Sequence, residues 1–190
     1  MKKTASATGK ALLGLLSIAP MSGYDIRQLI PWSIGQFWSE SYGQIYPALK
    51  QMTAAGLVER KTERKKGRPN RHVYSLTKLG RAELREWLDL PPVQEVPRNE
   101  LLLKLFFGAH VAPAVSREHV EAFLEIQERL LKTYQATAKT LRKEHASNPQ
   151  LPYWLMPLSM GRHRSMAMMK WCRETLAELE RIEQKQRGGK

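Results

Sequence analysis

The chain has a single cysteine and no long apolar run. Cys172 stands alone among 190 residues, so no disulfide can form within the chain and nothing requires an oxidising compartment. No stretch approaches the roughly 20 apolar residues that span a bilayer. Residues 11–19 are apolar and follow two lysines, as in a signal peptide, but the run is short and lacks an A-x-A cleavage site. We therefore expect a cytoplasmic protein.

Motifs that carry enzyme chemistry are also absent. The sequence contains no G-x-S-x-G, no G-x-G-x-x-G and no phosphate-binding glycine loop. No two histidines stand four residues apart with a carboxylate beside them, which is the arrangement that holds zinc on a helix. They are His72, His110, His119, His145 and His163. We expect no catalytic residue, no metal site and no cofactor, and we do not expect an enzyme.

Acidic residues are scarce relative to basic ones. The 31 lysines and arginines outnumber 18 aspartates and glutamates, which gives a net charge of +13 at pH 7. Such an excess of basic residues favours a polyanionic partner, and it favours nucleic acid over a membrane surface. The hydrophobic content of 42% indicates a folded globular protein, and 190 residues suffice for one medium domain or two small ones.

Residues 41–56 have the pattern of a capped amphipathic helix. Ser41 and Gln44 match the S-x-x-Q capping box, and Gly56 suits the left-handed conformation that ends many helices. The apolar face consists of Ile45, Leu49 and Met52. The other face carries Tyr42, Gln44, Tyr46 and Lys50. Because a proline removes a backbone donor, Pro47 predicts either a kink or a later start of this helix.

Two further helices are predicted before this one. The first runs from Gly9 to Pro20, and its apolar face holds Leu12, Leu15, Leu16 and Ala19. The second is capped by Ser22. Its inward residues are Ile26, Leu29 and Ile30.

A hairpin and a fourth helix are predicted after Gly56. Two strands, residues 57–63 and 71–77, flank a turn rich in glycine and proline, and Val73 and Leu76 are the apolar positions of the second strand. Thr77 caps the fourth helix. The apolar side of that helix consists of Leu79, Leu84, Trp87 and Leu88. Three helices, a hairpin and a helix follow the order of a winged helix-turn-helix.

The hairpin is strongly basic. Its cations are Arg60, Lys61, Arg64, Lys65, Lys66, Arg68 and Arg71, opposed by Glu63. A charged run of this kind is compatible with a solvated face, but a Gly-Arg-Pro turn beside a capped polar helix favours DNA. An arginine at the tip of a rigid turn, here Arg68, suits insertion into the minor groove.

The helix of residues 41–56 supplies the candidate base and phosphate contacts. Ser41 and Tyr42 lie at its N-terminus, where free amide groups bind phosphate. Gln44 suits a bidentate contact with adenine, and Lys50 suits phosphate or guanine. Tyr46 either contacts DNA or packs against the first helix.

A segment with three prolines, residues 89–98, separates these elements from a second helical region. We expect a winged-helix DNA-binding domain at residues 1–90, a linker at 91–98 and a helical dimerisation and effector domain at 99–190. Within residues 99–190, Asn99 begins a short apolar helix, and long helices span 113–145 and 156–186. The stripe of the last helix consists of Met166, Met169, Leu176, Leu179 and Ile182. Two such helices, about 45 Å long, cannot bury their apolar faces alone, so we expect a homodimer.

Residues 11–88 contain three specific motifs. They are SGY at 22–24, IYPAL at 45–49 with AGLVE at 55–59, and R-x-Y-x-L-T-x-x-G, for which this chain has His72-Val73-Tyr74 between Arg71 and Ser75. With these motifs the N-terminal region resembles the PadR family of bacterial transcriptional regulators. Pro47 belongs to this pattern. The C-terminal half is similar in layout to longer members with an extended helical domain.

The resemblance implies a dimeric repressor of mostly helical fold that binds a two-fold operator and that a small aromatic or phenolic effector releases. The candidate DNA contacts are Ser22, Tyr24, Ser41, Tyr42, Gln44, Tyr46, Lys50, Lys66, Arg68 and Arg71. Many members have Ser-Pro-Gly where this chain has Ser41-Tyr42-Gly43, so the base contacts here can differ from theirs.

The effector hypothesis depends on aromatic, methionine and histidine side chains near the C-terminus, because such residues form adaptable pockets. The candidates are Trp154, Met160, His163, Met166 and Trp171. The alternative is that these residues only pack at a helix interface. The protein would then be a ligand-independent architectural or partner-binding protein whose C-terminal helices only dimerise.

Overall fold

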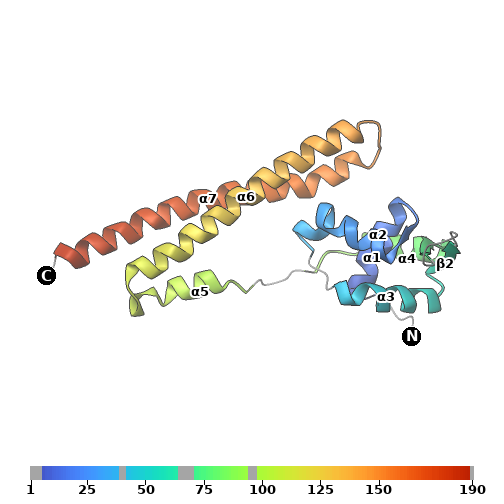
Figure 1. The fold of residues 1–190 in the computed structure, drawn as a ribbon, viewed down its shortest axis with the longest axis horizontal. Helices are drawn as coiled ribbons and strands as arrows, with labels where there is room; N and C mark the ends of the chain where they lie inside the picture. Colours follow the sequence, from blue (N-terminus) through green and yellow to red (C-terminus); the bar gives the residue numbers. More distant parts are fainter. Residues whose placement is uncertain (1–5, 39–41, 64–70, 94–97, 189–190) are drawn as a thin grey trace. The chain divides into compact units, whose positions relative to one another are not determined.

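A computed structural model describes residues 6–38, 42–63, 71–93 and 98–188. The chain divides into two compact units, Met1–Gln94 and Glu95–Lys190. Within the described ranges, no helix is long and apolar enough to cross a membrane. The fold is mostly helical with one small sheet, in agreement with the predicted fold class (Figure 1).

The first unit contains four α-helices, two short 3-10 helices and three strands among its described residues. They are α1 (Ala7–Ile18), β1 (Met21–Ser22), α2 (Gly23–Leu29), η1 (Ile30–Trp32), η2 (Ile34–Gln36), α3 (Tyr42–Ala54), β2 (Val58–Glu63), β3 (Arg71–Leu76) and α4 (Lys78–Asp89). Their order is that of a winged helix, as the sequence predicts, with β2 and β3 as the wing strands.

The sheet has the order β1-β3-β2, with both pairs antiparallel. The sequence predicts the β2–β3 hairpin but not β1, because two residues are too few to show an alternating pattern. In β3 the buried side chains are Tyr74 and Leu76, whereas Val73 is only half-buried. Side chains two residues apart share a face of a strand, so Tyr74 and Leu76 lie together on the buried face of β3.

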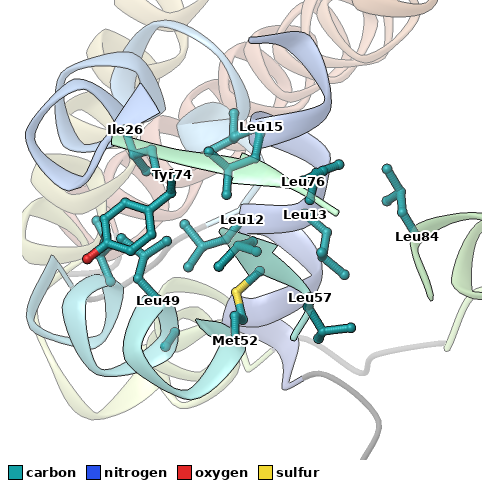
Figure 2. Packing of buried hydrophobic residues seen from close by; sticks show 14 of the residues in the cluster. Leu12, Leu13, Leu15, Ile26, Leu49, Met52, Leu57, Tyr74, Leu76 and Leu84 are labelled. Atoms are coloured by element: carbon teal, nitrogen blue, oxygen red, sulfur yellow. The ribbon is translucent and has the colours of Figure 1, made fainter. Parts of the chain in front are cut away.

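A leucine-rich core holds this unit together. Four leucines of α1 are buried, and they meet residues of the other helices and the sheet (Figure 2). The α1 leucines are Leu12, Leu13, Leu15 and Leu16. Leu13, which is fully buried, was not predicted, and the predicted Ala19 lies exposed after the helix end. Each buried leucine contributes roughly 1.5–3 kcal/mol, so the apolar run near the N-terminus is core-forming sequence.

The α3 helix has the predicted bounds and the predicted buried face. Ile45, Leu49 and Met52 are each at most 4% exposed. The helix begins at Tyr42, so the prediction of a later start is wrong, and Pro47 lies inside it. Gly56 has a φ of 71°, which confirms the left-handed turn at the helix end, and any other residue would be strained there.

The α4 helix follows the wing and is capped by Thr77, whose Oγ1 accepts a hydrogen bond from the Gly80 N–H (3.0 Å). Gly80 lies against the sheet so closely that a Cβ would be 2.1 Å from the Leu57 carbonyl oxygen. Leu84 is buried as predicted, and Trp87 packs on the core. The predicted apolar side also included Leu79 and Leu88, which are more than half exposed.

The second unit contains α5 (Glu100–Phe106), η3 (Gly108–His110), α6 (Pro113–Glu144) and α7 (Leu151–Gly188). Asn99 caps α5 as predicted, with Oδ1 accepting from the Leu102 N–H. The α6 and α7 helices run side by side in opposite directions (Figure 1). An ion pair of Arg117 with Glu183 (3.0 Å) joins the start of α6 to the end of α7.

The α7 helix begins five residues before the predicted Met156. Pro152 occupies the second position of α7, where its missing N–H has no helical partner to lose. Only a few side chains of the pair are fully enclosed, including Val120, Tyr134 and Cys172. Of the predicted α7 stripe, Met166 and Ile182 are exposed in the single chain.

Candidate nucleic-acid interface

The outward face of α3 carries a polar surface next to the buried one. Tyr46 and Lys50 are both exposed and stand four residues apart, so they are neighbours along one edge of the helix. Gln44 and Gln51, also exposed, stand seven residues apart along the other edge. Gln51 was not among the predicted contacts, although its spacing from Gln44 places it on the same edge. This surface offers two amides, a phenol and a cation to a partner.

Tyr46 packs against α2 instead of the first helix, and its side chain is also exposed. Its ring lies across the N-terminus of α2, so closely that a Cβ on Gly23 would be 2.6 Å from the ring Cε1. The side chain nevertheless remains 55% exposed. The neighbouring Tyr24 is 63% exposed. A glycine at position 23 therefore allows α2 and α3 to approach, and two phenol groups stay accessible near their junction.

Ser22, a predicted DNA contact, is buried and acts within the fold. Its Oγ accepts from the Asp25 N–H (3.2 Å), while its own N–H and hydroxyl donate to Asp25 Oδ2 (both 2.8 Å). This reciprocal arrangement is a capping box at the start of α2. With 5% of its surface exposed, Ser22 offers little to a ligand.

Arg71, another predicted DNA contact, forms ion pairs with two carboxylates. Its Nη2 contacts Asp25 Oδ2 on α2, and its Nη1 lies 3.9 Å from Glu63 Oε2 on the neighbouring strand. Burial raises the pKa of Asp25, but hydrogen bonds from the Ser22 N–H, Arg71 and the Ser22 hydroxyl outweigh it, so the pKa lies below its ordinary value. The hydrogen bond and charge of Asp25 raise the pKa of Arg71. Asp25 was not singled out from the sequence.

Four predicted contacts are not described, in whole or in part. Ser41, Lys66 and Arg68 lie outside the described residues, and for Tyr42 only the backbone at the start of α3 is described.

The wing strands that flank residues 64–70 expose Arg60 and Lys61 on β2. Over residues 1–94 the sequence has 15 basic and 7 acidic side chains, a net charge of +8.

Comparison with known proteins relates each half of the chain to a known family. Residues 12–86 match the "Transcriptional regulator PadR-like family", and residues 97–180 match the "Virulence activator alpha C-term" family. The "Negative transcriptional regulator PadR" of Bacillus subtilis is 29% identical over 180 residues, which are 90% of this chain and 96% of that protein. Residues 12–86 therefore form a PadR-like family domain.

Solved structures of PadR-like proteins share the fold. Bacillus subtilis PadR in complex with operator DNA superposes with a TM-score of 0.80 at 28% identity, over 92% of this chain and 99% of the other. The same protein with p-coumaric acid gives 0.72 at 29% identity, over 90% and 97%. The Vibrio cholerae virulence activator AphA gives 0.71 at 28% identity, over 93% and 99%. The N-terminal unit thus has the winged-helix fold of PadR-like DNA-binding proteins.

The two tryptophans among the candidate effector residues lie far apart along α7. Trp154 packs edge-on against His145 (5.5 Å between ring centroids), and Trp171 packs edge-on against Phe123 (6.3 Å). The other candidates, Met160, His163 and Met166, are exposed. Trp154 and Trp171 are seventeen residues apart on one helix, which is about 25 Å, so one small ligand cannot touch both in a single chain. Among the residues described, no group of three or more histidine, cysteine or acidic side chains is placed to hold a metal.

Proposed function

We propose that this chain is a dimeric repressor that binds a two-fold operator and that an aromatic or phenolic effector releases. The observation that carries the proposal is the polar outward face of α3, in a chain that superposes over 92% of its length on a PadR solved with operator DNA. The Bacillus subtilis relative is a negative regulator, which favours repression. Because such a protein must reach the chromosome, the prediction of a cytoplasmic location is kept.

In this proposal α3 enters the major groove. Gln44 binds an adenine edge, and Lys50 binds phosphate or guanine. The phenols of Tyr24 and Tyr46 bind backbone phosphates beside the groove, since hydroxyls commonly position a protein in this way. Lys66 and Arg68 of the wing grip the flanking minor groove, where the potential is most negative. Because Ser22 is engaged in the capping box of α2, we do not propose it as a direct DNA contact.

The second unit supports the homodimer in two ways. Its single-chain surface exposes many large apolar side chains, including Leu103, Phe106 and Met160, and such surfaces mark protein interfaces. On α6, the Gln127 Oε1 is buried and has no hydrogen-bond partner among the described residues. An unpaired buried amide oxygen costs about 1–3 kcal/mol, so a donor from a second copy would relieve it. Two copies would present two α3 helices to successive major grooves.

Selection of DNA from a random pool tests the DNA-binding part. The full chain is expected to enrich a palindromic sequence with half-sites about 34–36 Å, one helical turn, apart. Fluorescence anisotropy should then show binding to the selected duplex at least about a thousandfold tighter than to a scrambled duplex. Enrichment of no sequence, or equal affinity for both duplexes, would contradict a sequence-specific regulator.

The effector part needs a separate test. A p-coumaric acid complex exists for a relative, so p-coumaric acid is the first probe, followed by other phenolic acids and cationic aromatics. We expect quenching of tryptophan fluorescence and weaker binding of the selected duplex. Replacement of Trp154 by Phe should leave DNA binding intact and remove part of the quenching.

The separation of the candidate effector residues along α7 favours a second possibility. If residues about 25 Å apart serve only packing, the chain is a ligand-independent DNA-binding protein whose long helices dimerise. In that case the phenolic acids change neither fluorescence nor affinity for the selected duplex, although the duplex itself is still enriched.

A further inference from the structure

Arg71 occupies a junction between the wing and α2. It is the first residue of β3, the central strand, and β1 pairs with the same strand through Ser22 opposite Val73. Because β1 leads directly into α2, this pairing brings Asp25, in the first turn of α2, to the start of β3. Arg71 and Asp25 therefore meet although they are 46 residues apart.

Asp25 Oδ2 receives three donors at this junction. They are the Ser22 N–H and the Ser22 hydroxyl, both at 2.8 Å, and the Arg71 guanidinium. The first two hold α2 at its start, and the third comes from the wing. One carboxylate oxygen thus fastens a helix cap and a wing strand to each other, through charge-assisted hydrogen bonds that are directional.

The surroundings of Arg71 are poorly suited to binding phosphate. Asp25 faces the guanidinium from α2, and Glu63 faces it from β2, directly opposite in the strand register. Two nearby carboxylates cancel much of the cation's attraction for an anion. To bind phosphate, Arg71 would have to leave Asp25, whose charge would then lie next to the DNA. Lys50 on α3, by contrast, is exposed and has no ion pair among those found in the described residues.

We propose that Arg71 is a positioning residue, not a phosphate ligand. Through Asp25 it sets the placement of the wing relative to α2, and so the geometry in which wing and α3 meet the operator together. This inference rests on the proposed DNA-binding function and revises the role of one of its predicted contacts. A phosphate ligand strengthens binding to any DNA equally, whereas a positioning residue strengthens binding to the correct sequence most.

The substitution Asp25→Asn gives opposite expectations for the two roles. It removes a negative charge from a DNA-binding unit, so charge alone predicts tighter binding. The positioning role predicts weaker binding of the selected duplex, by about twofold or more, because residues joined in one network couple by at least about that factor. Affinity for the scrambled duplex should stay level or rise, so the ratio of the two affinities falls.

Substitutions of Arg71 provide the second half of the experiment. Arg71→Gln should lower the same ratio, and Arg71→Lys should restore part of it by keeping a cation within reach of Asp25. In the double variant Asp25→Asn with Arg71→Gln, the loss should be close to that of either single variant, since both break one contact. The slope of log affinity against log salt should stay unchanged for Arg71→Gln, while Lys50→Ala lowers it by about 0.9, as one lost phosphate contact requires.

Three results would overturn the positioning role: a tighter or unchanged complex for Asp25→Asn, a salt slope for Arg71→Gln reduced as for Lys50→Ala, or additive losses in the double variant. Glu63→Gln is the matched control, because it removes an acid beside Arg71 without touching the Asp25 bridge, and it should leave the ratio unchanged. Circular dichroism confirms that each variant is folded. If the wild-type chain selects no sequence at all, the proposed function fails, and that outcome is separate from any difference among variants.

Discussion

At the start of α2 a carboxylate of Asp25 joins local and distant parts of the first unit. Its bonds to Ser22 belong to the helix cap, and its ion pair with Arg71 reaches the wing. Both interactions require the ionised carboxylate, and together they lower its pKa despite partial burial. The hydrogen bonds and the ion pair thus make the partly exposed Asp25 important for the fold.

This lowered pKa gives a pH dependence with a definite sign. An acid whose pKa is lower in the folded state stabilises the fold fully above its unfolded pKa, for which the ordinary value is 3.8. The contribution is lost as the pH falls through the folded pKa. Urea unfolding should therefore show that Asp25→Asn lowers the free energy of unfolding at pH 6, and that the difference from wild type shrinks by pH 3. Glu59→Gln, an exposed acid on β2, is the control and should show a smaller difference at pH 6.

Gln44 permits a prediction about base recognition. If its amide binds one adenine, Gln44→Ala should reduce discrimination at a single base pair by about 1–3 kcal/mol. Measuring affinity for every single-base variant of the selected duplex checks this. Gln51→Ala, on the same edge of α3 two turns away, should affect a different base pair or none. A uniform loss across all duplexes would instead indicate that Gln44 contacts the backbone.

At the scale of elements, the turn between α3 and the wing is tied to the start of α4. Thr77 Oγ1 donates to the Gly56 carbonyl (2.7 Å) and accepts from the Gly80 N–H (3.0 Å). The Thr77 N–H also bonds the Leu57 carbonyl (3.1 Å). Thr77 therefore links, through its side chain and its backbone, the end of α3, the residue before β2 and the first turn of α4.

Thr77→Ala should consequently cost about 1–2 kcal/mol of the free energy of unfolding, the upper part of the range for loss of an N-cap. Thr77→Ser retains the hydroxyl and should cost less than half as much. Urea unfolding followed by circular dichroism distinguishes the two. Equal losses for both substitutions would show that the methyl group, not the hydroxyl, provides the stability.

At the scale of the whole molecule, the second unit exposes apolar side chains that its own fold does not cover. Phe106 on α5 is 82% exposed, and Met160 on α7 is 66% exposed. Because burying a large apolar side chain contributes roughly 1.5–3 kcal/mol, covering several of them is a substantial gain. In the proposed homodimer, the second copy of the chain covers these side chains.

Phe106→Gln tests this assembly. Since the ring is largely exposed in the single chain, its loss should leave the helical content and the unfolding of the monomer nearly unchanged. Sedimentation equilibrium should show a dissociation constant at least about tenfold weaker, equivalent to about 1.4 kcal/mol. Gln135→Ala, at an exposed polar position of α6, is the matched control and should not alter assembly. An unchanged dissociation constant for Phe106→Gln would place the dimer contact elsewhere.

The sequence by itself determined the helices, the wing strands and the buried face of α3. Spacings of three and four residues placed Ile45, Leu49 and Met52 in the core, and Thr77 and Asn99 marked helix starts. These patterns arise within one or two turns of chain, where periodicity and capping depend only on neighbouring residues. The motif around Pro47 also indicated the PadR-like domain that the family model matches at residues 12–86.

The tertiary structure alone decided which residues meet across the fold. Only the pairing of β1 with β3 brings Asp25 to Arg71, and only the packing of α2 on α3 places the Tyr46 ring over Gly23. It likewise leaves Leu79 and Leu88 exposed. The physical reason is that a local pattern fixes the face on which a side chain lies. The element packed against that face depends on chain segments tens of residues away.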